Sequence, residues 1–344
     1  MEENNNRNST LVCVTGGAGY IASFLVKKLL AKGYTVYATL RNLEDKSKVG
    51  LLKSFPNAEE RLKLFQADVY RPEEFEQAIQ GCEFVFHVAT PLLHSEGFQY
   101  KNKVEATVAS VKNIGKACIK SGTVRRLIYT GTVLSASPLK DDSNGFKELM
   151  DETCWTPLNI HFAFSDDYVR EYVEAKTMAE KEILNFGKNG FEVVSLGCGL
   201  VGGDTLLSNI STSMAAILSA VTGNEISYQQ LKFIEEVDGK VPIVHIEDVC
   251  EAHIFGMETA SINGRFLCAS SFVSSAEIAS YYKEKFPEFH INQRYLDDPK
   301  RAVKWGSKKL MDKGFVYKKD MKNILDDNIS RAKEIGVLNL SSSA

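Results

Sequence analysis

The amino-acid sequence predicts an α/β fold built on a doubly wound parallel sheet, with a smaller α/β domain formed by the C-terminal half. In the first half of the chain, short apolar runs typical of strands alternate with longer segments that carry apolar residues at helical spacing. This alternation implies crossover connections, and therefore a parallel sheet with helices on both faces. The predicted strands are 11–14, 34–40, 62–67, 84–88, 127–130 and 191–196. The predicted helices are 20–32, 72–80, 103–120, 172–186 and 321–335.

The composition of the 344 residues is that of an ordinary globular protein, with 44% hydrophobic and 25% charged residues. It excludes a disordered chain, a collagen-like fibre and a disulfide scaffold. The formal net charge of −3 gives no electrostatic footprint for nucleic acid or for an anionic membrane. The seven cysteines are far apart, form no CxxC pair and have no histidine at zinc spacing, so we expect reduced thiols and no metal site.

The sequence also bears on the cellular compartment. No window holds the run of apolar residues that a membrane span needs, and the polar N-terminus lacks the basic start and apolar stretch of a signal peptide. We therefore expect a cytoplasmic protein with no membrane span.

The alternation of strands and helices becomes irregular after residue 203. We expect segments of the C-terminal half to return to the first domain, so that the second domain is discontinuous. The predicted organisation is a disordered tail at 1–10, a dinucleotide-binding domain at 11–200, a mainly substrate-binding domain at 201–336 and a frayed tail at 337–344.

The residues TGGAGYIA, 15–22, join the first predicted strand to the first predicted helix. Small residues allow a tight turn and let backbone N–H groups approach a pyrophosphate, while the helix N-terminus offers partial positive charge. We therefore predict a Rossmann-type dinucleotide site contacted by Gly16, Gly19, Tyr20 and Ile21. The alternative is an ordinary strand-to-helix turn, since glycines occur in many loops.

The end of the second predicted strand favours NADPH over NADH. The strand holds no acidic residue that would bind the adenosine ribose 2′-hydroxyl, and Arg41 follows it directly. A planar guanidinium suits a 2′-phosphate, and Lys48 supplies a second cation. The alternative is that Arg41 is a solvated surface cation.

Two further loops are predicted to contact the cofactor, because ligands bind at the carboxyl ends of parallel strands. Asp68 and Val69 follow the third strand, where a carboxylate could accept a hydrogen bond from the adenine amino group. Val88, Ala89 and Thr90 follow the fourth strand, where small residues let the chain pass close to a ribose.

Tyr172 and Lys176 are predicted to carry proton transfer. At i, i+4 spacing their side chains share one face of a helix. A free phenol titrates near about 10, and a neighbouring ammonium favours the phenolate, which brings the phenol toward the range of general acid–base catalysis. Tyr168 lies one turn earlier and has no lysine at i+4. The spacing also occurs by chance, and the alternative is a surface helix with a semi-buried tyrosine.

A hydroxyl that holds the substrate carbonyl oxygen is expected at the end of the fifth strand. Either Thr130 or Thr132 could supply it. The alternative is that both threonines reflect the preference of this residue for strands.

Taken together, these residues resemble a known family. TGGAGYIA at 15–22, Arg41, HVATP at 87–91, YVEAKTMAEK at 172–181 and VHIEDVCEAHIF at 244–255 are similar to motifs of the extended short-chain dehydrogenase/reductases. Within them, the motifs resemble the plant dihydroflavonol reductase and anthocyanidin reductase group, and they lean toward anthocyanidin reductase. The resemblance covers residues 10–336.

The resemblance implies that the family's Ser-Tyr-Lys triad is represented by Thr132, Tyr172 and Lys176, the last two also lying against the nicotinamide ribose. It further implies cofactor contacts by Thr130, Gly199 and Val201. This chain departs from the family pattern in two places. It reads T-G-T at 130–132 in place of T-S-S, and it has Gly-Cys-Gly at 197–199 where relatives usually carry a proline.

We therefore predict an NADPH-dependent reductase of a flavonoid-like or related plant secondary metabolite, with Tyr172 as the proton donor. The substrate is expected to be a small aromatic molecule bound by segments 133–165 and 205–233. The predicted substrate contacts are Pro91, Val133, Ser137, Phe164 and Tyr168. Proteins that this chain resembles are often monomers, so we expect a monomer, with a homodimer as the alternative.

Two other functions fit the same motifs. An epimerase or dehydratase acting on nucleotide sugars shares the fold and the tyrosine–lysine spacing, but returns the hydride to its substrate. A non-catalytic NADPH-binding protein is favoured by the two departures, whereas the intact Tyr172 and Lys176 pair argues against it. His245, near Glu247 and Asp248, is interpreted as a structural hydrogen-bonding residue.

Overall fold

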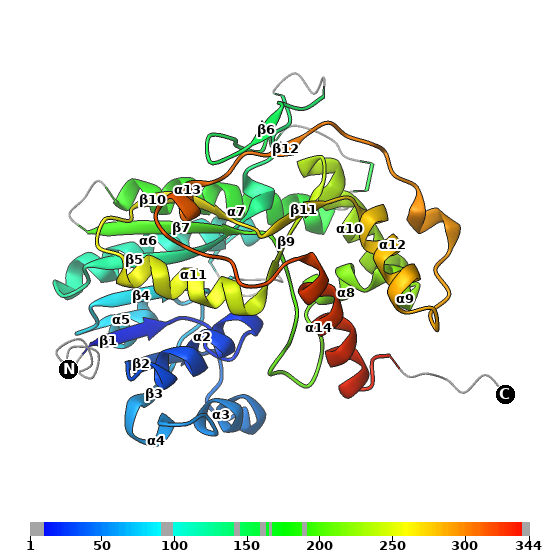
Figure 1. The fold of residues 1–344 in the computed structure, drawn as a ribbon. Helices are drawn as coiled ribbons and strands as arrows, with labels where there is room; N and C mark the ends of the chain where they lie inside the picture. Colours follow the sequence, from blue (N-terminus) through cyan, green and yellow to red (C-terminus); the bar gives the residue numbers. More distant parts are fainter. Residues whose placement is uncertain are drawn as a thin grey trace. The chain divides into compact units, whose positions relative to one another are not determined.

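The computed structural model describes residues 10–90, 99–140, 145–158, 163–164, 167–187 and 191–338 (Figure 1). By its internal contacts the chain divides into two compact units, and each unit is built from separated segments. The first unit comprises 1–131, 171–196 and 250–266. The second unit comprises 132–170, 197–249 and 267–344.

A seven-stranded sheet forms the centre of the first unit, in the order β10-β7-β5-β4-β1-β2-β3. The pairs β2–β3, β1–β2, β1–β4 and β4–β5 are all parallel. Because the chain moves in one direction from β1 to β3 and in the other from β4 onward, the order reverses between β1 and β4. Such a reversal opens a crevice at the carboxyl ends of the two strands. The strands are β1 Leu11–Val14, β2 Thr35–Leu40, β3 Leu62–Gln66, β4 Phe84–His87, β5 Arg126–Thr132, β7 Glu192–Cys198 and β10 Gly264–Cys268.

Helices lie on both faces of this sheet (Figure 1), so the predicted doubly wound α/β fold is confirmed. Side chains from α5, α6 and α7 share one hydrophobic core with alternate residues of β1, β4, β5 and β7. On the opposite face, His253 of α11 contacts Thr130 of β5. The helices of this region are α2 Tyr20–Ala31, α3 Lys46–Lys53, α4 Ala58–Arg61, α5 Phe75–Ile79, α6 Lys103–Ser121, α7 Asp167–Phe186 and α11 Ile246–Glu258, with a 3-10 turn at Pro72–Glu74.

The second unit contains two small sheets. In the first, β9 pairs in parallel with β8 and antiparallel with β11, and in the second, β6 pairs in parallel with β12. Their strands are β6 Leu149–Met150, β8 Leu200–Gly202, β9 Val241–His245, β11 Ser271–Val273 and β12 Lys304–Trp305. The helices are α8 Thr212–Ile217, α9 Ser219–Thr222, α10 Glu225–Asp238, α12 Ser275–Lys285, α13 Lys309–Asp312 and α14 Met321–Glu334, with 3-10 turns at Val133–Ser135 and Gln293–Leu296.

The structure bears on two expectations from the sequence, the state of the cysteines and the presence of a membrane span. All seven cysteines are buried free thiols. Across the described residues, no helix is both long and apolar enough to span a lipid bilayer.

Helix α7 is held in the first unit by charged groups. The buried carboxylate of Glu180 accepts hydrogen bonds from Arg265 Nε of β10 at 3.1 Å and from the Ser195 hydroxyl of β7 at 2.6 Å. Earlier in the helix, Glu171 accepts the backbone N–H of Lys103, the first residue of α6, at 2.9 Å. The helix is therefore fixed at one end to the sheet and at the other to α6.

We expect Glu180→Gln to destabilise the protein by about 3–5 kcal/mol, because it leaves the buried Arg265 guanidinium without its counter-charge. Urea-induced unfolding measures the change. Glu182→Gln is the matched control, since Glu182 lies on the same helix and forms a half-exposed pair with Lys112 at 3.7 Å. That change should cost less than about 1 kcal/mol, and equal effects of the two variants would contradict the expectation.

The glycine turn after β1 generates a second stability prediction. A Cβ at position 17 would lie only 2.8 Å from the Cβ of Ala38 on β2. Gly17→Ala therefore has to push the turn away from the sheet, which should destabilise the fold by about 1–3 kcal/mol. At Gly50, in α3, an added Cβ meets no described atom within 4 Å, so Gly50→Ala should stabilise it by about 0.5–1 kcal/mol. Thermal unfolding measures both variants, and the midpoint temperature should fall for Gly17→Ala and rise for Gly50→Ala.

Candidate active site

The predicted phosphate-binding turn lies between β1 and α2, at the carboxyl end of the sheet. Gly16 has a φ of +68°, and a Cβ there would approach the Ala89 Cβ to 3.1 Å. The turn is tied to β2 because the backbone N–H of Gly17 donates to the Thr39 carbonyl at 2.8 Å. Helix α2 begins after Gly19, which has no side chain to cap it. Across 16–19 the methyl group of Ala18 is the one side chain, and it is buried. The turn is thus a cradle of small residues at a helix N-terminus, which fits a pyrophosphate.

Thr15 connects this turn to the end of β4. Its hydroxyl oxygen accepts the backbone N–H groups of Val88 and Ala89, each at 3.0 Å. Its own hydrogen is therefore donated to His87 Nδ1, 2.9 Å away. Burial lowers the pKa of the His87 imidazole to about 3, and the Lys176 ammonium acts in the same direction. His87 is therefore a neutral, fixed acceptor, and the cradle and the loop after β4 form one hydrogen-bonded unit.

The Lys176 ammonium lies at the end of β5, where only 3% of the residue is exposed. It donates to the Thr130 carbonyl at 2.7 Å and to the Thr90 hydroxyl at 3.3 Å. It also lies 4.5 Å from the centre of the Tyr129 ring. Lys176 therefore joins the ends of β4 and β5, beside the loop that Thr15 fixes.

Tyr172 lies one turn before Lys176 on α7 and is half-buried. Its phenol is close enough to that of Tyr129 to raise the pKa of Tyr129, after the larger contributions of burial and of Glu180. Both predicted proton-transfer residues thus neighbour Tyr129, a residue that our reading of the sequence missed. Its partners are distant in sequence, so no local signal pointed to it.

Thr130 and Thr132, the alternatives for the substrate hydroxyl, have different surroundings. The Thr130 hydroxyl shares a buried hydrogen bond of 2.8 Å with His253 Nε2. The Thr132 hydroxyl oxygen accepts the Leu134 backbone N–H at 3.3 Å, which leaves its own hydrogen available for donation. This difference favours Thr132 as the hydroxyl that meets a substrate, and gives Thr130 a structural role.

The residues predicted to favour NADPH over NADH follow β2. Arg41 is exposed directly after the strand. Lys48 is also exposed, but its ammonium lies 3.2 Å from the Asp45 carboxylate that caps α3. Arg41 is consequently the better placed of the two cations to meet a further anion.

The other predicted cofactor contacts occupy loops at the carboxyl ends of β3 and β4. The Asp68 carboxylate accepts the Tyr70 backbone N–H at 3.0 Å, and Val69 is buried. Val88, Ala89 and Thr90 are all half-buried. The predicted substrate contact Pro91 lies outside the described residues.

In the second unit, Gly199 and Val201 lie on or beside β8. A Cβ at Gly199 would come within 2.7 Å of the Pro242 carbonyl oxygen, so this position accommodates only glycine. Val201 is buried. The close approach of Pro242 to the chain therefore gives a packing reason for the glycine at 199.

The predicted substrate contacts of the second unit differ in exposure. Val133 and Ser137 are buried, and Ser137 donates to the Val237 carbonyl and accepts the Leu139 N–H at 3.1 Å. That arrangement favours a structural role for Ser137 over the substrate contact that we predict. Phe164 and Tyr168 are 42% and 40% exposed.

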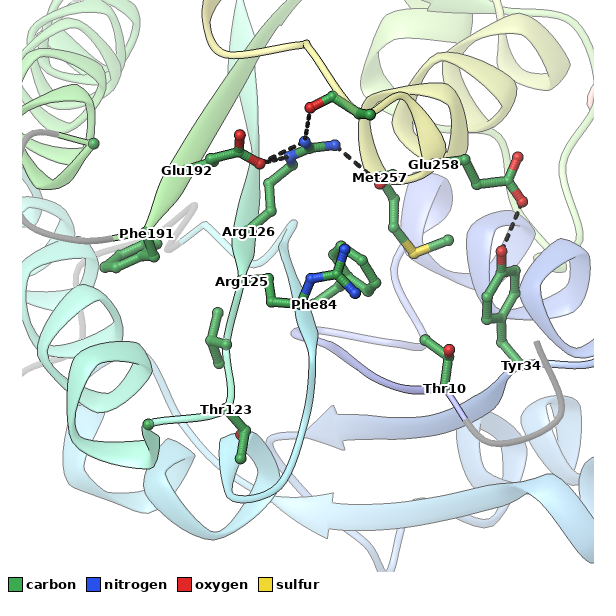
Figure 2. Close-up of a pocket in the computed structure, with 14 residues that line it drawn as sticks. Thr10, Tyr34, Phe84, Thr123, Arg125, Arg126, Phe191, Glu192, Met257 and Glu258 are labelled. Atoms are coloured by element: carbon green, nitrogen blue, oxygen red, sulfur yellow. Dashed lines mark hydrogen bonds and ion pairs between the residues drawn. The ribbon is translucent and has the colours of Figure 1, made fainter. Parts of the chain in front are cut away.

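A cavity of about 960 Å³ lies at the opposite, amino end of the strands (Figure 2). The most buried charged residue that lines it, Arg126, is already hydrogen-bonded to other groups of the protein. The guanidinium binds Glu192 and the carbonyls of Gly256, Met257, Thr259 and Ala260 at the C-terminus of α11. Ligands of such sheets bind at the carboxyl ends, so this cavity is distinct from the candidate active site.

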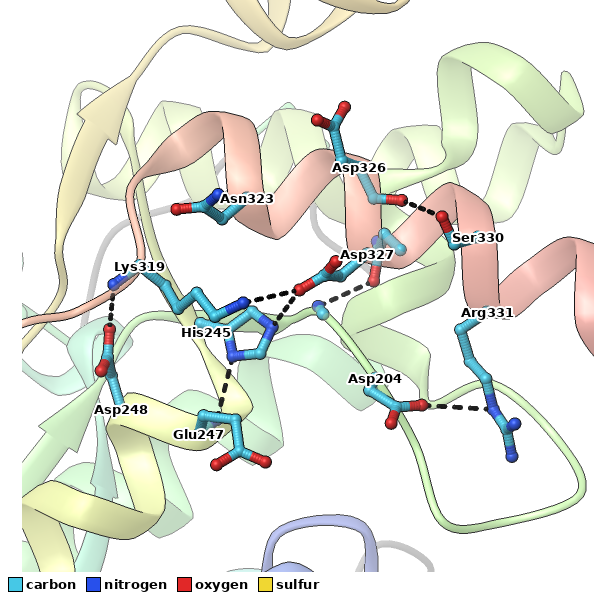
Figure 3. Close-up of polar contacts among 12 residues, drawn as sticks. Asp204, His245, Glu247, Asp248, Lys319, Asn323, Asp326, Asp327, Ser330 and Arg331 are labelled. Atoms are coloured by element: carbon cyan, nitrogen blue, oxygen red, sulfur yellow. Dashed lines mark hydrogen bonds and ion pairs between the residues drawn. The ribbon is translucent and has the colours of Figure 1, made fainter.

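His245, at the end of β9, lies in a polar cluster of the second unit (Figure 3). Its Nδ1 accepts the Glu247 N–H at 3.1 Å, so Nε2 carries the proton and donates to Asp327 at 3.1 Å. A Cβ at Gly203 would overlap the His245 ring. The neighbouring N–H of Gly203 donates to Asn328 of α14 at 3.0 Å. These contacts are those of a structural histidine.

Comparison with known proteins identifies the family. The model of the NAD dependent epimerase/dehydratase family matches residues 12–268. Anthocyanidin reductase ((2S)-flavan-3-ol-forming) of Vitis vinifera is 33% identical over 328 residues, which cover 95% of this chain and 96% of the relative. Dihydroflavonol 4-reductase of Gerbera hybrida is 33% identical over 342 residues, 98% of this chain and 89% of the relative.

The crystal structure of vestitone reductase from alfalfa (Medicago sativa) matches with a TM-score of 0.77 at 32% identity, covering 95% of this chain and 99% of that one. The family that the motifs indicated is therefore confirmed. This chain belongs to the NAD dependent epimerase/dehydratase family, the extended short-chain dehydrogenase/reductases.

Proposed function

We propose that this protein is an NADPH-dependent reductase of a flavonoid-like aromatic substrate, in which Tyr172 supplies the proton. The observation that carries the proposal is the buried Lys176 ammonium, held by Thr130 and Thr90 one helical turn from the half-buried Tyr172. A reductase needs this pair, whereas a protein that only binds a dinucleotide does not.

The chain's own residues suit the binding of the cofactor. The cradle of small residues at 16–19 would hold the pyrophosphate, and Arg41 would pair with the 2′-phosphate that distinguishes NADPH. Lys176 and Thr90, which are already hydrogen-bonded to each other at 3.3 Å, would meet the nicotinamide ribose. When bound, NADPH supplies the hydride.

The reaction adds a hydride to an electrophilic carbon and a proton to the oxygen that becomes negative, or to the carbon conjugated with that oxygen. Tyr172 donates that proton, and the Lys176 ammonium stabilises the phenolate that remains. Thr132 donates its hydroxyl hydrogen to the same substrate oxygen, since its oxygen already accepts the Leu134 N–H. The products are an alcohol, or a reduced conjugated ring, and oxidised cofactor.

The names of the relatives point to the class of substrate. Anthocyanidins, dihydroflavonols and vestitone are the compounds in the names of the similar enzymes. Exposed aromatic side chains at Phe164 and Tyr168 offer ring surfaces for such a substrate. We assign the substrate to this aromatic class.

A substrate panel tests the proposed function. The protein is incubated with NADPH and with an anthocyanidin, a dihydroflavonol, vestitone or a nucleotide sugar, and both NADPH oxidation and product mass are followed. A reductase consumes one or two equivalents of NADPH and adds two or four hydrogen atoms. An isomerised or dehydrated nucleotide sugar without net consumption would instead indicate an epimerase or dehydratase. Binding of NADPH without turnover of any substrate would indicate a non-catalytic protein.

We expect Tyr172→Phe to lower kcat by about 10²–10⁴-fold, because it removes the proton donor. The dissociation constant for NADPH, measured by fluorescence titration, should change little. Tyr168→Phe is the matched control, since Tyr168 lies one turn earlier on the same helix and is 40% exposed. Undiminished turnover of Tyr172→Phe would refute the assignment.

We expect Arg41→Leu to weaken NADPH binding by about 10–100-fold, the value of one or two charge-assisted hydrogen bonds to phosphate. Binding of NADH, which lacks the 2′-phosphate, should be unaffected. Lys48→Leu should have the smaller effect, because Lys48 already pairs with Asp45. Equal losses for both cofactors in Arg41→Leu would show that Arg41 does not read the phosphate.

A further inference from the structure

Tyr129 belongs to the hydrophobic core of the first unit and lies beside Lys176 of the proposed proton-transfer pair. It is on β5, is 1% exposed, and faces α7 within the shared hydrophobic core. The centre of its ring is 4.5 Å from the Lys176 ammonium and 5.7 Å from that of the His87 ring. The ring therefore forms part of the enclosure around a nearly fully buried cation.

The protonation state of Tyr129 determines what the ring offers to Lys176. Burial raises the pKa of the Tyr129 phenol well above its usual value, and Glu180 and Tyr172 act in the same direction. Tyr129 is consequently a neutral phenol, which presents the negative face of an aromatic quadrupole rather than an anion. Such a face attracts an ammonium, and the attraction is stronger where water is excluded.

The hydroxyl of Tyr129 is not what holds the ring in place. It is buried, and within the described part of the chain it has no hydrogen-bond partner. The position of the ring follows instead from core packing, in which Leu127 and Ala179 take part. Any effect of Tyr129 on Lys176 should therefore come from the ring and survive loss of the hydroxyl.

The burial of Lys176 makes such a contact useful. Desolvation by itself favours the neutral amine, which could not stabilise a phenolate at Tyr172. The Thr130 carbonyl and the aromatic face both favour the charged form. The other described titratable groups near the Tyr129 ring are Tyr172, His87, which is neutral, and Glu180, which is paired with Arg265.

We propose that Tyr129 is a positioning residue whose ring face keeps the Lys176 ammonium charged, one helical turn from Tyr172. The consequence for activity depends on the proposed function. The contact between ring and ammonium does not depend on it, because that contact is a property of the protein alone.

The direct test is the titration of Lys176, followed by NMR of protein labelled with ¹³C at the lysine ε-carbon and assigned with Lys176→Met. Phenylalanine, and phenylalanine with one, two or three ring fluorines, replace Tyr129 with little change of shape while the ring face becomes progressively less negative. We expect Tyr129→Phe to titrate as the wild type does. The midpoint should fall stepwise with fluorination, and by about one pH unit in Tyr129→Leu.

Kinetics with the substrate found in the panel supplies a second readout. We expect Tyr129→Phe to keep kcat within about twofold of wild type. At pH values above the Lys176 midpoint, Tyr129→Leu should lose about tenfold in kcat, with little change in NADPH affinity. Thermal unfolding shows whether each variant is folded. If Tyr129→Leu is unfolded, the fluorinated phenylalanine variants take its place in the kinetic comparison.

Two outcomes would overturn the inference. A Lys176 midpoint that does not respond to fluorination shows that the ring face does not act on the ammonium. A Tyr129→Phe variant as impaired as Tyr129→Leu shows that the hydroxyl is what matters. Failure of the substrate panel affects the proposed function only, because the NMR titration needs neither substrate nor cofactor.

Discussion

Charged side chains buried along helix α7 need partners in the sheet, and this requirement organises the first unit. Lys176 donates a hydrogen bond to the Thr130 carbonyl on β5, and Glu180 accepts hydrogen bonds from Arg265 on β10 and Ser195 on β7. Each buried charge would be strongly unfavourable without its partner, so the helix has little freedom to slide or rotate against these strands. The residues that would move a proton are therefore presented by a rigid element.

The same principle explains how distant motifs cooperate. Thr15 joins the glycine turn to the loop after β4 through two backbone N–H groups and His87. Thr130 joins β5 to α11, because its hydroxyl meets His253. The motif at 244–255 thus contributes to the site through the second of its histidines, whereas the first, His245, serves the second unit.

Much of the fold could be predicted because it depends on local patterns. The strand–helix alternation, the glycine turn and the Tyr172–Lys176 spacing are all short-range signals, and they led to the correct fold class and family. The strand β10 was missed, since Arg265 reads as a polar interruption until Glu180, 85 residues away, neutralises it. The hydrogen bond from Ser137 to the Val237 carbonyl could not be predicted, since the two residues lie 100 positions apart in the sequence.

The cluster around His245 has a consequence for the order in which the protein can become structured. Residues 203–207 are held by α14, because Asn328 binds Gly203 and Arg331 binds both Asp204 and the Leu207 carbonyl. The first of these contacts joins residues 125 positions apart. During synthesis the segment after β8 must therefore wait for α14 to leave the ribosome before it is fixed, which makes it one of the last parts of the chain to acquire its native conformation.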